Sequence, residues 1–307
     1  MKNKKLFAIL TLVCFMFTLM PVAAFATGDG NTTVSVTSES ELRDAVANVN
    51  VSEINLGTNI TLDNVLEIGR TVTINGENHS IISGDTRVIR ITESNVEVTM
   101  NNVNVVSTAY REGSNDVRGI SIDNETEVKL ELNNCSVNFD PESGTDWAYG
   151  VNISGGASNV TLAISGGTYE GANVINVWGD NHIITVDGAT LNCLYGYNSA
   201  YHGQCVRLEG TGSEVTVKNT VFNGDWAVSI EETAGNTIVT DNNTDNTKLS
   251  ITVNNENELR NAIADETATT IVLGADIPLS AYFKIIKTTR NSFLACMKVI
   301  FDPRQII

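Results

Sequence analysis

Apolar and polar residues alternate over short segments that recur through the middle of the chain. Val96–Met100 reads Val-Glu-Val-Thr-Met, and Val128–Leu132 reads Val-Lys-Leu-Glu-Leu. A period of two directs one set of side chains into a core and the other into water, as in a half-buried β-strand. These segments begin near Val72, Val96, Val128, Val160, Ile184, Val215 and Ile238. The pattern predicts a repeated unit of roughly 23 residues that is sometimes enlarged by about 8.

Each segment is followed by the same sequence of features. A glycine or asparagine, which best tolerates a left-handed backbone, comes two residues after the last apolar position and predicts a tight bend. These residues are Gly76, Asn102, Asn134, Gly166, Gly188 and Asn219. A third apolar position comes next, at Val105, Val137, Tyr169, Leu191 and Phe222. A second alternating strand then begins near Val88, Ile120, Val151, Val174, Val206 and Val228.

A unit of strand, bend, strand and turn cannot bury its own apolar face. Stacked units bury that face, and their strands then pair in parallel between successive rungs. An antiparallel sandwich would instead show hairpin signals every 8–12 residues, which are scarce here. The sequence therefore predicts an all-β fold, a parallel β-helix.

A different pattern precedes the first rung. Leu42, Ala45, Val46 and Val49 share one face of a helix predicted at about 39–49, and acidic residues suit its N-terminus. The open end of a solenoid needs a cover, because its free strand edge would pair with other chains. We expect this short α-helix to be the N-terminal cap.

The cap sequence occurs twice. Residues 34–62 align without gaps to 251–279, with about 12 of 29 positions identical. We therefore expect residues 27–249 to form one β-helix unit and residues 250–307 to begin a second. Residues 290–297 carry neither the alternation nor the acidic bias, so this second unit is interpreted as truncated, with an aberrant C-terminus.

The N-terminus and the charge indicate export. Residues 1–26 have a lysine-rich start, an apolar stretch too short for a comfortable membrane span and small residues at the expected cleavage position, as in a signal peptide. The net charge is −17 at pH 7. Such an acidic chain repels nucleic acids and anionic membranes. The expected location is therefore secreted or at the cell surface, with no membrane span after signal cleavage.

The cysteines leave two interpretations open. In an oxidising compartment, Cys193 and Cys205 could bridge the loop between them, which is the candidate disulfide. They could equally be buried thiols in separate strands. No cysteine or histidine spacing suggests zinc, so we predict no metal site of that kind.

Several segments carry a resemblance to a known family. Val128–Cys135 and Val215–Phe222 resemble rungs of the right-handed parallel β-helix, or pectin-lyase-like, superfamily. The predicted cap helix followed by Ile54–Leu62 is similar to the cap and first coil of that superfamily. The resemblance covers most of residues 34–250 and implies a right-handed coil. The superfamily includes polysaccharide lyases, glycoside hydrolases and non-catalytic bacterial surface proteins, and tandem units on an acidic exported chain resemble the last, adhesin-like group.

The catalytic motifs of the enzymatic branches are incomplete, and the catalytic residues are therefore unknown. Asn243–Asp245 matches the Asn-x-Asp motif of polygalacturonases, but no Asp-Asp pair follows and Tyr201–Gly203 matches Gly-His-Gly only in half. Trp178–His182 has one residue too many for the Trp-x-Asp-His motif of pectate lyases, and the arginine motif is absent. We interpret both segments as turns. His79 and His182 are likewise read as surface or turn residues.

Three acidic residues end the second strands at positions read as equivalent. They are Asp123, Glu209 and Glu231, and stacking would bring Glu209 close to Glu231. Calcium could relieve that repulsion. A solvated acidic ridge needs no ion and is the preferred interpretation, so no cofactor is predicted, with calcium the one alternative.

The enlarged rungs are the best candidates for a binding site. Their inserted loops, 107–118, 139–149 and 194–204, should project from one side because rungs stack in register. Aromatic faces stack on sugar rings, and Asp, Arg and His bind hydroxyl groups. The candidate ligand-binding residues are Tyr110, Arg111, Asp116, Arg118, Asp146, Trp147, Tyr149, Tyr195, Tyr197, Tyr201 and His202. The alternative is that these loops fold over and cover apolar rungs.

Two functions therefore compete. The first is a non-catalytic surface protein that binds an extracellular glycan or cell-surface polymer through its aromatic loops. The second is a polysaccharide lyase or glycoside hydrolase, and a purely structural spacer stays open as a third. The missing carboxylate and arginine motifs favour the first.

Overall fold

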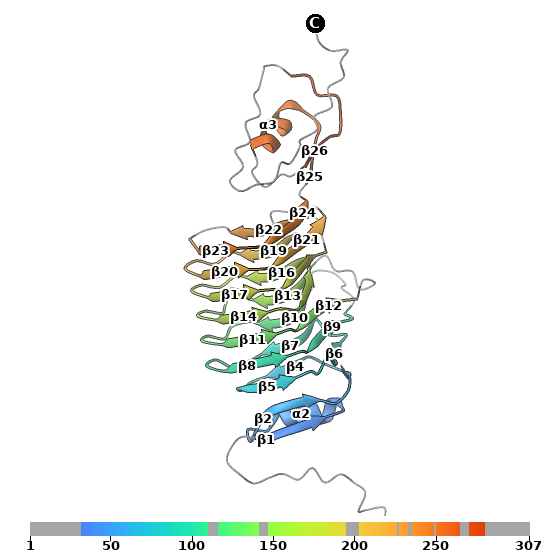
Figure 1. Cartoon of the computed structure of the whole chain (residues 1–307), viewed down its shortest axis with the longest axis vertical. Helices are drawn as coiled ribbons and strands as arrows, with labels where there is room; N and C mark the ends of the chain where they lie inside the picture. Colours follow the sequence, from blue (N-terminus) through green and yellow to red (C-terminus); the bar gives the residue numbers. More distant parts are fainter. Residues whose placement is uncertain are drawn as a thin grey trace, which may run out of the picture.

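The computed structural model describes residues 32–109, 116–140, 147–194, 203–225, 227–232, 235–248, 250–264 and 270–279. Strands of successive rungs stack on one another and pair in parallel (Figure 1). The prediction of an all-β parallel β-helix with a short capping α-helix is confirmed. Among the described residues, no helix combines the length and apolar character that a membrane crossing needs.

The strands of the β-helix form three sheets. The first sheet has nine strands: β1 (Thr32–Val36), β2 (Val51–Leu56), β5 (Val72–Asn75), β8 (Glu97–Asn101), β11 (Lys129–Asn133), β14 (Thr161–Ser165), β17 (Ile183–Asp187), β20 (Glu214–Lys218) and β23 (Thr237–Asp241). The second has eight: β3 (Ile60–Leu62), β6 (Ser80–Ser83), β9 (Asn104–Ser107), β12 (Ser136–Phe139), β15 (Thr168–Gly171), β18 (Thr190–Cys193), β21 (Val221–Asp225) and β24 (Thr244–Lys248). The third has seven: β4 (Leu66–Ile68), β7 (Arg87–Ile91), β10 (Val117–Ile122), β13 (Ala148–Ile153), β16 (Asn173–Val177), β19 (Gln204–Leu208) and β22 (Val228–Glu232).

Each rung therefore contributes three strands, where the sequence indicated two. The isolated third apolar position belongs to the second sheet, whose strands of three to five residues are too short to show a clear alternation. The predicted segment starts Val72 and Val96 are also not equivalent, because Val72 pairs with Val98. The predicted starts Val160 and Ile184 are not equivalent either, because Ile184 pairs with Leu162. The other segments of the first sheet pair as predicted, for example Leu130 with Leu162.

The core is a stack of aliphatic side chains along the axis of the coil. Inward-facing residues of the first sheet, such as Val98, Leu130 and Leu162, are fully buried. Each rests on its counterpart in the next rung, since these residues are register partners. Full burial of one such side chain contributes about 1.5–3 kcal/mol. The hydrophobic ladder explains why the two-residue period decides the fold.

The predicted left-handed bends lie between the first and second sheets. Asn102, Asn134 and Asn219 have φ values of 52°, 52° and 49°, and Gly166 and Gly188 have 69° and 71°. The prediction of a left-handed backbone at Gly76 was wrong, because the left-handed residues of that turn are Glu77 and Asn78. The asparagines also form ladders between rungs, in which Asn134 Nδ2 donates to Asn102 Oδ1 at 2.9 Å.

Asn134→Ala is expected to lower the free energy of unfolding by about 1–2 kcal/mol, because alanine is strained in the left-handed region. Asn134→Gly should cost less, since glycine adopts this conformation freely although it also loses the ladder bond. Chemical denaturation of both variants measures the difference. Equal stability of the alanine and glycine variants would show that backbone strain does not limit this turn.

Helix α2 (Glu39–Ala47) caps the N-terminal end. Ser38 accepts from the backbone N–H of Glu41, and Glu41 accepts from the backbone N–H of Thr37 at 2.7 Å, an arrangement similar to a capping box but shifted by one residue. Leu42, Ala45 and Val46 are buried as predicted. Val49 is 79% exposed, because the helix ends at Ala47 and the apolar face does not extend past it.

The second copy of the cap sequence has the same elements. Strand β25 (Ser250–Val253), helix α3 (Glu256–Ala264) and strand β26 (Thr270–Leu273) follow the order of β1, α2 and β2, and β25 pairs with β26 in parallel. Glu258 accepts from the backbone N–H of Asn254 at 2.7 Å, as Glu41 does in α2. The extent of a second unit beyond these residues stays a prediction.

Candidate functional site

The three predicted loops leave the coil at the same corner. They connect β9 to β10, β12 to β13 and β18 to β19, so each joins the second sheet to the third. Residues 110–115, 141–146 and 195–202 of these loops lie outside the described residues. The same holds for most of the predicted ligand-binding side chains, namely Tyr110, Arg111, Asp146, Tyr195, Tyr197, Tyr201 and His202.

Four of the predicted residues are described. Arg118 Nη2 lies 3.4 Å from Asp116 Oδ2, so these two residues pair with each other. Trp147 is half-buried, and its backbone oxygen accepts from Val117. Tyr149 is only 3% exposed, so it cannot offer its ring to a ligand in this conformation.

The outward side chains of the third sheet form a continuous polar layer, which we call the polar face, and most of them are buried. Strand pairing arranges them in two columns: Arg90, Ser121, Asn152, Asn176, Arg207 and Glu231, and beside them Arg87, Arg118, Tyr149, Asn173 and Gln204. A third column, Asp123, Ser154, Trp178 and Glu209, follows directly after the paired strand ends. The polar face begins next to the corner at which these loops join the second sheet to the third.

The centre of the polar face is a buried hydrogen-bonded chain. Asn176 Nδ2 donates to Asn152 Oδ1 at 2.7 Å, and Asn152 Nδ2 donates to Ser154 Oγ at 2.9 Å. Ser154 Oγ in turn donates to Asp123 Oδ1 at 3.1 Å. Buried amides whose bonds are satisfied hold one geometry. This chain therefore fixes the positions of the more exposed groups at its two ends.

Trp178 is the exposed group at one end. Trp178 is 43% exposed, and its Nε1 donates to Asn176 Oδ1 at 2.9 Å. The guanidinium carbon of Arg207 lies 5.3 Å from the ring centroid, within cation–π range. Arg207 is itself buried and pairs with Glu209. The indole is thus an apolar surface held in a set orientation next to water.

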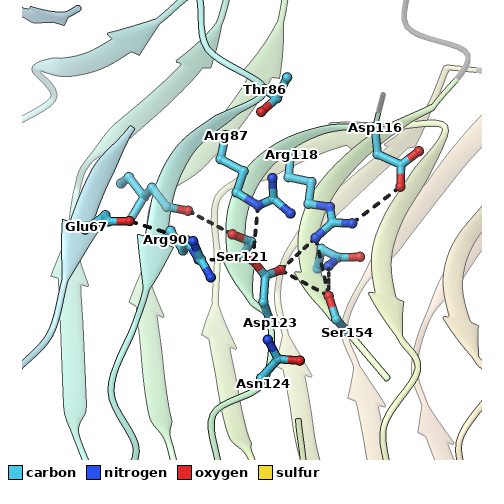
Figure 2. A network of polar contacts seen from close by, with 12 residues as sticks. Glu67, Thr86, Arg87, Arg90, Asp116, Arg118, Ser121, Asp123, Asn124 and Ser154 are labelled. Atoms are coloured by element: carbon cyan, nitrogen blue, oxygen red, sulfur yellow. Dashed lines mark hydrogen bonds and ion pairs between the residues drawn. The ribbon is translucent and has the colours of Figure 1, made fainter. Parts of the chain in front are cut away.

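Three arginines surround Asp123 at the other end (Figure 2). Asp123 Oδ2 lies 3.2 Å from Arg87 Nε and 3.1 Å from Arg90 Nε, and Oδ1 lies 2.7 Å from Arg118 Nη1. The Asp123 side chain is only 10% exposed. A buried carboxylate with several charge-assisted partners is a strongly held anchor.

Sequence reasoning missed Trp178, Arg87 and Arg90 as parts of this site. Trp178 does lie in the predicted turn between rungs, but its contacts involve Asn176 and Arg207, which are two and 29 positions away. A usable signal was the recurrence of arginine at outward positions of the second strands. Arg87, Arg90, Arg118 and Arg207 all occur there.

The acidic residues after the second strands are not equivalent in the way the sequence indicated. Glu231 pairs in register with Arg207, not with Glu209, and it accepts from Gln204 Nε2 at 2.5 Å. The arrangement therefore differs from the expected repulsive pair. In the described part of the chain, no group of three or more His, Cys, Asp or Glu residues is placed to hold a metal ion.

His182 is buried rather than a surface residue, with 1% exposure. Its Nδ1 accepts from the backbone N–H of Val160 at 3.1 Å, which requires the neutral ring. Burial lowers the pKa of His182 below its ordinary value, although nearby Asp180 acts in the opposite direction. The imidazole is a structural link between two rungs and not a ligand-facing group.

This burial gives a pH dependence of stability. The folded state holds His182 neutral while the unfolded chain binds a proton near its ordinary pKa of about 6.5, so stability is complete above that pH and falls as the pH drops below it. We expect the loss of thermal stability between pH 7 and 5 to be smaller in His182→Gln than in the wild type. Identical pH profiles for both proteins would contradict this role.

The structure holds Cys193 and Cys205 as buried free cysteines in β18 and β19. This arrangement corresponds to the interpretation of two buried thiols in separate strands, while the candidate disulfide between them stays a prediction. The pKa of the Cys205 thiol is raised well above its ordinary value by its hydrogen bond with Cys193 and by burial. A thiol kept protonated in this way is unreactive.

One comparison with known proteins is informative. Residues 33–142 match the family model described as "Putative pectate lyase-like adhesive domain". This region covers the cap and the first rungs, including Arg87, Arg90, Arg118 and Asp123. Neither the curated proteins nor the solved structures gave a match. The match agrees with the resemblance to the pectin-lyase-like superfamily and indicates an adhesive role for this type of domain.

Proposed function

We propose that this protein is an extracellular adhesive protein that binds carbohydrate, without cleaving it, along the polar face of its third sheet. The observation that carries the proposal is Trp178, an exposed indole held by Asn176 and Arg207. The matched adhesive family supports surface exposure and adhesion.

The geometry around Trp178 suits a sugar ring. An indole face gives apolar contact with the C–H side of a sugar, while polar groups near its edge bind hydroxyl groups. Ser154 and Glu209 occupy the neighbouring rungs on either side of Trp178 and are partly exposed. Because the buried amide chain prevents rearrangement, little side-chain ordering is needed on binding.

Trp178→Ala is expected to weaken glycan binding tenfold or more, since loss of a central tryptophan costs on the order of 2 kcal/mol in such contacts. Glycan arrays followed by calorimetry on the best ligand measure the loss. Ile183→Ala is the matched control, because Ile183 is 51% exposed on the first sheet, away from the polar face. Trp147→Ala separately tests the end of the second predicted loop, directly before β13.

Equal binding by the Trp178 and Ile183 variants, with unchanged circular dichroism, would show that the polar face is not the binding surface. Loss of binding in Trp147→Ala alone would move the site to the loops. Failure of the wild type to bind any glycan would reject carbohydrate recognition itself.

A further inference from the structure

The arginine cluster at Asp123 has more hydrogen-bond donors than its acidic partners use. Three guanidinium groups carry fifteen N–H donors in principle, whereas one carboxylate offers about four acceptor positions. Among the described residues, Arg87 contacts an acidic group only through Nε. The Glu67 carboxylate is 3.7 Å from Arg90 Nη1 and 56% exposed, which makes it a weak partner.

The unused donors are accessible. The side chains of Arg87 and Arg90 are 28% and 34% exposed, while Asp123 lies beneath them at 10%. Figure 2 shows both arginines converging on Asp123 from one strand, with Arg118 on its other side. The buried carboxylate therefore orders the guanidinium groups, and their outer nitrogens stay available to a second anion.

The surroundings make this cluster exceptional on the molecule. The chain has 19 lysine and arginine residues against 36 aspartate and glutamate residues, so most of its surface repels anions. Three arginines gather around Asp123 at one place, and with Asp116 and Glu67, which pair with Arg118 and Arg90, the formal charges of the cluster cancel. The cluster is therefore much less repulsive to an anion than the acidic chain as a whole. Arginine is also the side chain best suited to bidentate contact with carboxylate or sulfate groups.

The cluster and Trp178 lie on the same strip. Asp123, Ser154 and Trp178 occupy the same position after the strand ends of three successive rungs. Neighbouring strands are about 4.8 Å apart, so Asp123 and Trp178 are roughly 10 Å apart along the stack. A glycan lying across the strands could stack one ring on Trp178 and place a substituent at the arginines.

We propose that Arg87, Arg90 and Arg118 form a subsite for an anionic substituent, a carboxylate or sulfate, carried by the bound glycan. This inference rests on the proposed function. Asp123 is the internal counter-ion that orders the subsite, and the ligand's oxygens accept from the outer nitrogens of Arg87 and Arg90. The subsite makes the protein selective for acidic over neutral polysaccharides.

The test uses one backbone with three charge states: dextran, carboxymethyl dextran and dextran sulfate. Wild-type protein should bind at least one charged form tenfold or more tightly than neutral dextran, and the preference should weaken with added salt. Arg87→Gln combined with Arg90→Gln should abolish the preference. Lys129→Gln is the control for loss of a positive charge elsewhere. Lys129 pairs with Glu97 and Glu131 on the first sheet, so this variant should leave the preference within twofold.

Arg87→Lys with Arg90→Lys guards against a folding defect, since it keeps both charges but loses the planar fork. It should fold as the wild type does and show a reduced preference. Whichever of the two charged forms is bound more tightly identifies the substituent. Equal binding of charged and neutral dextran by the wild type, or a preference that survives in the glutamine variant, would overturn the subsite. If the preference depends on the arginines but not on Trp178, the anion subsite stands and the proposed stacking surface fails.

Discussion

Asp123→Asn is expected to destabilise the β-helix by about 2–4 kcal/mol, more than the loss of any single arginine around it. Removal of one partner of a buried ion pair leaves the other charge uncompensated and typically costs 3–5 kcal/mol. The partial exposure of Arg87 and Arg90 lowers that figure here. Urea denaturation measures the change as a shift in midpoint at constant slope.

The same network supplies a control. Glu67→Gln removes another carboxylate that faces Arg90, but this carboxylate is 56% exposed at 3.7 Å, so its loss should cost less than about 1 kcal/mol. Similar costs for the two variants would contradict a central role for Asp123. Added sulfate should raise the stability of Asp123→Ala more than that of the wild type. In the variant an external anion can occupy the position of the missing carboxylate.

The fold could be predicted because it depends on a one-dimensional pattern. In a stacked coil each rung contacts mainly its neighbours, so alternation, bend residues and interval length carry most of the information. The asparagine bends and the hydrophobic ladder are local features of this kind. The cap helix was also recognisable, since its acidic start and apolar face are contiguous in the sequence.

The predictions of the fold were wrong where a strand is too short to show alternation, or where the register between strands determines which residues pair. The strands of the second sheet have too few residues to show alternation, so only their central apolar position was visible. The pairing of Val72 with Val98, rather than Val96, depends on the length of the intervening turn. At the cap, Val49 continued the helical period but the helix had already ended.

The site was less predictable because outward positions look alike in the sequence. Alternation shows that Arg90, Asn152 and Trp178 face outward, but it does not show which outward side chains contact one another. Asp123 contacts arginines from β7 more than thirty residues earlier, and only the register between β7 and β10 brings them together. Composition directed attention to the aromatic loops, whereas the described polar groups converge beside them.

Close stacking at one corner of the coil leads to the largest expected effect. Gly210 packs against the backbone of Gly179 in the preceding rung, and a Cβ atom at position 210 would lie 1.7 Å from the Gly179 oxygen. The obstacle is backbone, so no side chain can move aside, and the rungs would have to separate. We expect Gly210→Ala to cost at least about 3 kcal/mol, in the range that marks severe steric defects.

Gly84→Ala provides the matched comparison, because a Cβ atom at position 84 would be 3.6 Å from its nearest neighbour, Thr108 Oγ1. That distance is an ordinary van der Waals contact, so Gly84→Ala should be neutral or slightly stabilising through its effect on the unfolded chain. Neither glycine has a left-handed φ, so the pair separates steric stacking from backbone strain. If thermal melts showed the two variants to be equally stable, the spacing between rungs at this corner would have to be looser than the structure describes.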